Sequence, residues 1–117
     1  MKNVTIYHNP RCSKSRETLA LLEQHGVDPK VVLYLETPPT VDELKKLLKE
    51  LGFTSARELM RKKEDLYKEL KLADESLSEE QLLAAMTANP KLIERPIVVK
   101  GSKARIGRPP EQVLEIL

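Results

Sequence analysis

Residues 3–35, NVTIYHNPRCSKSRETLALLEQHGVDPKVVLYL, carry the pattern that decides the fold. Residues 3–7 predict a short strand, because apolar and polar side chains alternate there. A helical pattern then runs from Ser13 to Gly26, where a glycine is a natural helix stop. Residues 31–35 form a continuous apolar run, which is typical of a buried parallel strand. Strand, helix and strand in this order predict a right-handed βαβ unit.

The middle of the chain, about residues 40–90, shows helical patterns throughout. Helix starts are marked by capping boxes, in which a Ser or Thr stands three residues before a Glu or Gln. The capping pairs are Thr40 with Glu43, Ser55 with Glu58, and Ser78 with Gln81. The pair at Ser55 is followed by a stripe of apolar residues between Leu59 and Leu70. Apolar stripes of this kind indicate packing in a core rather than a cofactor site. We therefore expect a helical insertion of three or four short helices.

The strand pattern returns in residues 97–106, which predict a hairpin with a two-residue turn at Gly101 and Ser102. Two consecutive prolines then precede a short amphipathic helix. Its expected apolar residues are Val113, Leu114 and Leu117. In this order the elements predict an α/β fold, a thioredoxin-like mixed four-stranded sheet with a helical insertion. We expect a single domain over residues 1–117.

The composition excludes several classes of protein. With 20 Lys and Arg against 18 Asp and Glu, the net charge of +2 is too small for binding nucleic acid or membrane by bulk charge. Aromatic residues make up only 3%, too few for stacking on single-stranded nucleic acid. The N-terminus lacks the apolar core of a signal peptide, and no apolar run approaches the roughly 18 residues of a membrane span. We expect a cytoplasmic protein, and a monomer.

The single cysteine, Cys12, cannot form an internal disulfide. With only His8 and His25 to supplement it, we expect no metal site and no bound cofactor. Cys12 falls at the start of the first expected helix, where free N–H groups and the helix dipole lower the pKa of a thiol. Most free cysteines are small buried fillers, but the neighbouring Arg11 and Lys14 favour a nucleophile here.

Ser15 follows Cys12 by three residues and completes a C-x-x-S spacing. Its hydroxyl, about one helical turn away, could donate a hydrogen bond to the sulfur. In C-x-x-C oxidoreductases the second thiol resolves the mixed disulfide, which a serine cannot do. If Cys12 is catalytic, the resolving thiol must come from another molecule, such as glutathione or a thiol protein.

The two histidines have different expected roles. His8 is either a base or cation that helps to ionise Cys12, or a polar strand end, and we favour the supporting role. His25 precedes Gly26 at a helix C-terminus, where a solvated cationic side chain suits the dipole.

Three arginines, Arg61, Arg95 and Arg108, are candidates for binding an anion. Each could be an ordinary exposed charge, but Arg95 and Arg108 precede Pro96 and Pro109 at rigid element boundaries. Pro96, at the head of an expected buried strand, is a candidate for a cis peptide bond. Several arginines aimed at one thiolate would hold a tetrahedral oxyanion by charge-assisted hydrogen bonds.

Five segments resemble those of glutaredoxin-dependent arsenate reductases. They are YHNPRCSKSR at 7–16, YLETPP at 34–39, RK at 61–62, ERPIVV at 94–99 and GRP at 107–109. Together they span nearly the whole chain. The sequence stops at Leu117, after the last expected helix, whereas well-known members of the family carry an additional C-terminal tail.

The resemblance implies a thioredoxin-like fold and an arsenate reductase activity. Cys12 would attack arsenate and form a covalent thiol–arsenate adduct, and His8 and Ser15 match the residues that favour its thiolate. The residues that match the family's oxyanion-holding positions are Arg61, Arg95 and Arg108. Glutathione would reduce the adduct, glutaredoxin would resolve the mixed disulfide, and arsenite would leave.

Two other functions stay open at this point. The first is a regulator similar to the Spx proteins, which share this fold and bind RNA polymerase. Those regulators typically carry C-x-x-C as a redox switch, and Ser15 in place of the second cysteine counts against this alternative. The second is a glutathione-dependent thiol protein without arsenate activity, whose oxyanion site is vestigial.

Overall fold

A computed structural model describes residues 4–117 and shows a mixed α/β fold; Asn3, in the expected first strand, lies outside the described part. In chain order the elements are β1 (Val4–Tyr7), α1 (Ser13–Gln24), β2 (Lys30–Val32), α2 (Val41–Leu51), η1 (Ala56–Leu59), α3 (Asp65–Glu69), α4 (Glu79–Ala88), η2 (Pro90–Leu92), β3 (Ile97–Lys100), β4 (Lys103–Ile106) and η3 (Pro110–Ile116). The chain forms two compact units. The sheet unit comprises residues 4–37 and Arg95–Leu117, and the helical unit comprises Pro38–Glu94.

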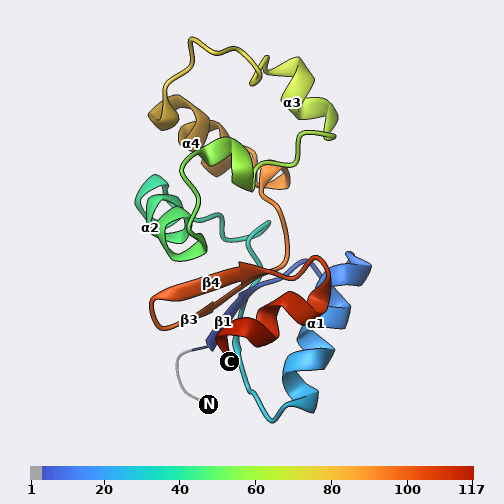
Figure 1. Cartoon of the computed structure of the whole chain (residues 1–117). Coiled ribbons are helices and arrows are strands. Elements are labelled where there is room, and N and C mark those ends of the chain that lie inside the picture. Colours follow the sequence, from blue (N-terminus) through green and yellow to red (C-terminus); the bar gives the residue numbers. More distant parts are fainter. Residues whose placement is uncertain (1–3) are drawn as a thin grey trace. The chain divides into compact units, whose positions relative to one another are not determined.

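Within the described residues, four strands form one sheet in the order β2-β1-β3-β4. Figure 1 labels β1, β3 and β4 of this sheet. β2 runs parallel to β1, whereas β3 runs antiparallel to both β1 and β4. The first and last parts of the chain therefore share one sheet, because β1 pairs with a strand that follows the whole helical unit. The mixed four-stranded sheet expected from the sequence is confirmed.

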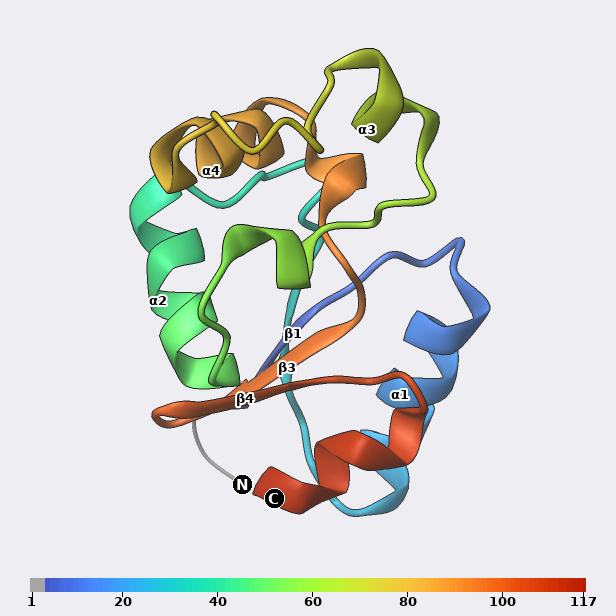
Figure 2. The ribbon, with the colours of Figure 1, turned by 45° about the horizontal axis from the view of Figure 1, so that its top comes forward.

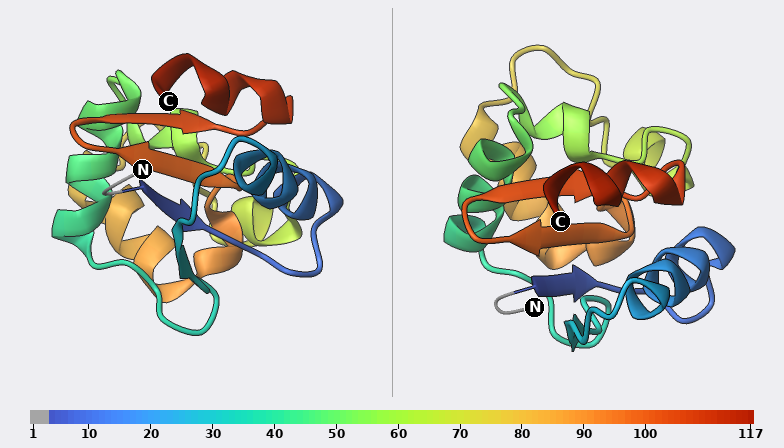
Figure 3. Two further views of the ribbon diagram at one scale, coloured as in Figure 1. Left: turned by 90° about the horizontal axis from the view of Figure 1, so that it is seen from below. Right: turned by 60° about the horizontal axis from the view of Figure 1, so that its bottom comes forward.

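One face of this sheet is covered by α1 and η3 (Figure 3). The buried cluster between them consists of Val4, Ile6, Leu22, Val27, Val98, Val113 and Ile116. η3 is a 3₁₀ helix, in which residues three apart share one side, so its buried residues are Pro110, Val113 and Ile116. Of the three expected apolar residues, Val113 is buried in this cluster and Leu117 is half-buried and packs against it, whereas Leu114 is half-buried and is not part of it.

β2 is an edge strand and differs from the expected one. It covers Lys30–Val32 rather than residues 31–35, and the chain turns at Leu33, whose carbonyl oxygen accepts two backbone N–H groups. Val31 is 43% exposed and Leu35 is 38% exposed, so the expected buried strand was wrong. An apolar run alone does not reveal that a strand has a neighbour on one side only.

β3 and β4 form the expected hairpin. Gly101, the first residue of its turn, has a φ of 61°, a left-handed conformation that glycine adopts more easily than other residues. Ile97 pairs with Ile106 at the open end of the hairpin. The segments that precede β3 and follow β4, which carry Arg95 and Arg108, are therefore brought to the same end of the sheet.

The helical unit contains α2 and α4, which lie side by side (Figure 2). All three expected capping boxes are confirmed, with hydrogen bonds in both directions within each pair. The stretch after Ser55 differs from the expectation, because it forms η1 and then a five-residue α3 that buries none of its residues. Leu70, expected on an apolar stripe, is exposed. No helix within residues 4–117 is long and apolar enough to cross a membrane.

Candidate active site

Cys12 lies between β1 and α1, at the N-cap position of the helix. Its N–H donates to the carbonyl oxygen of Asn9 at 3.0 Å, and its own carbonyl oxygen accepts the N–H of Arg16 at 3.0 Å. Its side chain caps no backbone group, and the residue is 9% exposed. The loop and the first turn of α1 thus hold the sulfur beside free helix N–H groups.

The surroundings of Cys12 lower the pKa of its thiol below the ordinary value. Burial is the largest influence and by itself raises the pKa. The N–H of Ser15, the positive charge of Arg95 and the N–H of Lys14 favour the thiolate, and together they outweigh burial. The lowered pKa expected from the sequence is therefore confirmed, and its sources are the helix start and a distant arginine.

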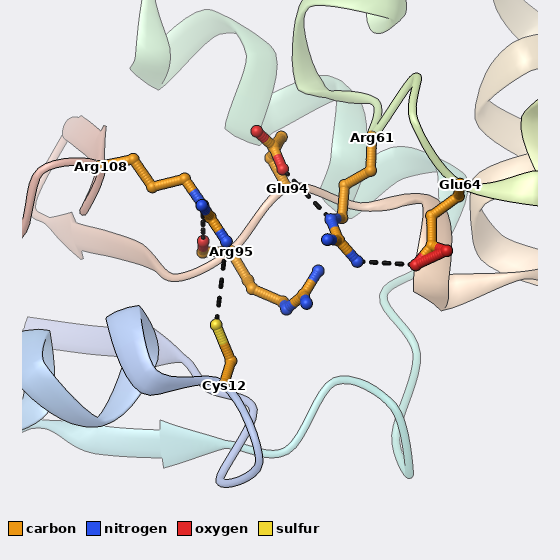
Figure 4. Close-up of polar contacts among 6 residues, drawn as sticks. All are labelled: Cys12, Arg61, Glu64, Glu94, Arg95 and Arg108. Atoms are coloured by element: carbon orange, nitrogen blue, oxygen red, sulfur yellow. Dashed lines mark hydrogen bonds and ion pairs between the residues drawn. The ribbon is translucent and has the colours of Figure 1, made fainter.

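Two of the candidate arginines lie in the sheet unit with Cys12 (Figure 4). Nη2 of Arg108 is 3.8 Å from Sγ of Cys12, and Nε of Arg108 donates to the carbonyl oxygen of Arg95 at 2.9 Å. Nε of Arg95 is buried and has no hydrogen-bond partner among the described residues. An unused buried donor beside a thiolate is suited to an oxygen of a bound anion.

Both of these arginines precede a proline. The peptide bonds Arg95-Pro96 and Arg108-Pro109 are both cis. The expected cis bond at Pro96 is therefore confirmed, whereas the sequence did not single out Pro109 for the same conformation.

His8 and Ser15 contact each other rather than the sulfur. Nδ1 of His8 lies 2.6 Å from Oγ of Ser15, and the N–H of Asn9 donates to the same oxygen at 3.0 Å. The expected hydrogen bond from the Ser15 hydroxyl to Cys12 is not present in the described part of the chain; Ser15 acts on the thiol through its backbone N–H. The buried His8–Ser15 pair instead ties the loop after β1 to the first turn of α1.

The surroundings of His8 disfavour its charged form. Burial, and then the positive charge of Arg16, lower the pKa of His8 below its ordinary value of 6.5. A cation that ionises Cys12, one of the two supporting roles expected from the sequence, is therefore disfavoured by the lowered pKa of His8. The geometry shows an imidazole nitrogen of His8 within hydrogen-bond distance of the Ser15 hydroxyl.

Because folding lowers the pKa of His8, the unfolded chain binds more protons than the folded chain below about pH 6.5. We expect the stability contributed at this position to be complete above that pH and to fall as the pH drops toward the folded-state pKa. Thermal unfolding from about pH 7.5 to about pH 5 should show a steeper loss of Tm for the wild-type chain than for His8→Gln, which cannot titrate. Equal slopes for the two chains would contradict this prediction.

Arg61, the third candidate, lies in the helical unit between η1 and α3. Its Nη1 is 2.7 Å from Oε1 of Glu64, and its Nε is 3.4 Å from Oε1 of Glu94 (Figure 4). Its guanidinium is thus held by two carboxylates of its own unit, whereas the other two candidate arginines belong to the sheet unit.

Asn9 shapes the loop, although it was not among the expected site residues. Its carbonyl oxygen accepts the N–H of Cys12, and its Oδ1 accepts the N–H of Arg11 at 3.0 Å. Nη1 of Arg16 donates to the carbonyl oxygen of Pro10 at 2.9 Å and holds the same loop from α1. The Asn-Pro dipeptide is a turn signal that could have pointed to this role.

A hollow of about 420 Å³ lies beside the loop. It is lined by His8, Asn9, Pro10, Arg11, Leu33, Leu35 and Glu36. Its walls combine charged and apolar side chains, which suits a small molecule with both kinds of group. Across residues 4–117, no three His, Cys, Asp or Glu side chains gather in a group that could hold a metal ion.

The helix that follows the first strand of a mixed four-stranded sheet begins at a lone, acidified cysteine. This arrangement defines a thioredoxin-like protein whose single thiol has a lowered pKa. Residues 7–116 match the ArsC family, and the chain belongs to this family.

Relatives of this chain match it over almost its full length. Escherichia coli strain K12 has a protein called YfgD, described as uncharacterized, that is 73% identical and aligns over 99% of this chain and 98% of its own. An arsenate reductase of Haemophilus influenzae is 55% identical, with 98% of this chain and 99% of that protein covered. Among solved structures, an arsenate reductase from Vibrio cholerae superposes with a TM-score of 0.97 at 64% identity, covering 98% of each chain.

Proposed function

We propose that the chain is an arsenate reductase in which Cys12 is the nucleophile. The observation that carries the proposal is the grouping of a thiol of lowered pKa with Arg108 at 3.8 Å and with Arg95, whose buried Nε lacks a partner among residues 4–117. A thiolate beside such donors can receive a tetrahedral oxyanion and attack its central atom. Relatives of this chain are arsenate reductases, and this supports arsenate as the oxyanion.

In the proposed reaction the Cys12 thiolate attacks the arsenic of arsenate. A sulfur–arsenic bond forms and one arsenic–oxygen bond breaks, and its oxygen leaves as water after taking up protons. A glutathione thiolate then attacks the Cys12 sulfur, and the electron pair of the sulfur–arsenic bond stays on arsenic, which leaves as arsenite. The two electrons come from the two sulfurs, which are now joined in a mixed disulfide. A glutaredoxin thiolate takes over the glutathione and releases the Cys12 thiolate.

The proposed roles of the other residues follow from their contacts. Arg95 and Arg108 hold the oxyanion. Arg95 also favours the thiolate by its charge and by hydrogen bonding, and Arg108 contacts the sulfur through Nη2. His8 and Ser15 keep the loop in place against α1, so that the N–H groups at the helix start stay directed at the sulfur. For Arg61 the support is the family resemblance alone.

Glutathione and glutaredoxin are proposed as partners because the chain has no second cysteine to resolve a disulfide. The hollow beside the loop supports this choice, because it offers space and an arginine, Arg11, to a small anionic thiol. A reaction that consumes glutathione needs a reducing compartment, so we also propose that the protein works in the cytoplasm. We further propose that it works as a monomer.

The proposed function is tested by coupling the wild-type protein to glutathione, glutaredoxin, glutathione reductase and NADPH. We expect NADPH oxidation that depends on arsenate and on each of the two thiol partners. Turnover with glutathione but without glutaredoxin would support the arsenate reductase activity and contradict the proposed requirement for glutaredoxin. A folded protein that gives no arsenate-dependent turnover would overturn the proposal and favour a thiol protein with a vestigial anion site.

A further inference from the structure

Gly107, between β4 and Arg108, stands where no side chain fits. A Cβ atom at this position would lie 2.9 Å from Cγ of Pro96 and 3.1 Å from Cγ2 of Thr18, and closer still to Oγ1 of Thr18. Carbon atoms in ordinary contact are about 3.5–4.0 Å apart. The φ of Gly107 lies outside the left-handed region, so space rather than backbone conformation requires a glycine here.

The neighbours of Gly107 are held in place. Thr18 is fully buried in α1, and its Oγ1 donates to the carbonyl oxygen of Lys14 at 2.8 Å. Pro96 is a buried ring whose carbonyl oxygen accepts the N–H of Gly107 at 2.9 Å. A methyl group at position 107 would therefore push the end of β4 away from α1 and from the start of β3.

The two segments that meet at the contact between Gly107 and Pro96 both carry an arginine of the candidate site. Arg108 follows Gly107 directly, and Arg95 precedes Pro96. The contact from Nη2 of Arg108 to Sγ of Cys12 is already long at 3.8 Å, so a small displacement breaks it. Cys12 itself is at the N-terminus of the helix that carries Thr18.

We propose that Gly107 and Thr18 are positioning residues, whose close packing sets where the guanidinium groups of Arg95 and Arg108 lie with respect to the sulfur of Cys12. In this proposal both residues act through the arginines and not by their own contact with the sulfur or the anion. The inference deepens the proposed function, because it names what holds the two anion-binding residues at the thiolate.

The test compares Gly107→Ala with Gly101→Ala, the same substitution at the other end of β4, where an added Cβ meets nothing within 4 Å. The readout is the rate of Cys12 alkylation by iodoacetamide as a function of pH, which gives the pKa of the thiol. We expect Gly107→Ala to react about threefold to tenfold more slowly at about pH 6 than the wild-type protein, because its thiol pKa is higher. Gly101→Ala should lower the Tm and leave the thiol pKa unchanged.

A second pair of variants separates positioning from general damage to the fold. In Thr18→Ala/Gly107→Ala two of the three crowding atoms are absent, so its thiol pKa should lie closer to the wild-type value than that of Gly107→Ala. If Gly107→Ala does not fold, a folded double variant with a nearly wild-type thiol pKa supports the proposal. A folded Gly107→Ala with the wild-type thiol pKa overturns it, as does a double variant that is unfolded or shows no recovery.

The alkylation experiment requires no arsenate, so its outcome is independent of the proposed function. Absence of arsenate turnover in the wild-type protein would remove the reductase proposal and leave the positioning role intact. Where turnover is measured, Gly107→Ala should raise the KM for arsenate more than it lowers kcat, because the displaced arginines contact the substrate.

Discussion

Cys12→Ser is expected to reduce arsenate-dependent NADPH oxidation to the uncatalysed background, a loss of at least about a thousandfold. The serine hydroxyl has nearly the shape of the thiol, but its pKa is far too high for the helix N–H groups and Arg95 to ionise it at neutral pH. The substitution also removes the sulfur that must supply one of the two electrons in the proposed reduction. The coupled assay with the full set of thiol partners measures this loss.

The fold should survive the change at Cys12, because serine is a favoured N-cap residue that can accept the same helix N–H groups, and because Arg108 Nη2 touches the sulfur only at 3.8 Å. Thermal unfolding followed by circular dichroism should give nearly the same Tm for Cys12→Ser and wild type. A folded Cys12→Ser protein that retains arsenate-dependent turnover would falsify the assignment of Cys12 as the nucleophile.

The second large effect is expected from Arg95→Ala, which should lower kcat/KM for arsenate about tenfold to a hundredfold. The substitution removes the buried Nε donor, which is unpartnered among residues 4–117, and the charge that lowers the pKa of Cys12. Most of the loss should appear in KM, because the oxyanion is held in the bound state as well as in the transition state. Arg95→Lys should be intermediate, since a lysine keeps the charge but lacks the planar fork of donors.

Arg105→Ala is the matched control for Arg95→Ala. Arg105 lies on β4 in the same unit, and its guanidinium contacts Oε1 of Glu115 at 3.0 Å and the carbonyl oxygen of Ala104 at 2.8 Å. An arginine in an exposed ion pair contributes little, so both the thiol pKa and the kinetic constants should stay at their wild-type values. Equal losses in Arg95→Ala and Arg105→Ala would show that the effect is one of bulk charge and not of position.

Local chemistry allowed much of the fold to be predicted from the sequence. The capping pairs at Thr40, Ser55 and Ser78 marked helix starts correctly, because each is formed within four residues of chain. The place of Cys12 at the start of α1 followed from the same kind of information.

Properties that depend on distant neighbours were harder to predict. The run around Val31 looks like a buried strand, and only the sheet order shows that it lies at an edge. The segment after Ser55 has the apolar residues of a helix but breaks into two short pieces, because it is set by contacts with other parts of its unit, such as the pairing of Met60 with Ile93.

In the candidate site, too, features set by neighbouring residues were easier to predict than contacts between distant residues. Nothing in the local pattern of Arg108 shows that it lies beside Cys12, since the contact depends on the pairing of β3 with β1 and β4. The family resemblance supplied that expectation for Arg95 and Arg108. The partner of the Ser15 hydroxyl was predicted wrongly, because helical spacing considers only Cys12, whereas the loop after β1 brings His8 to the same hydroxyl.

The bond from Nε of Arg108 to the main-chain oxygen of Arg95 has an evolutionary consequence. Every residue at position 95 has a main-chain oxygen, so a substitution there leaves the hydrogen bond from Arg108 in place. Position 95 can therefore change in evolution without displacing the side chain of Arg108. Position 108 has no such freedom, because lysine has a single nitrogen and cannot hold the carbonyl and reach the sulfur at once. Natural variation between Arg and Lys should therefore be tolerated more readily at position 95 than at position 108.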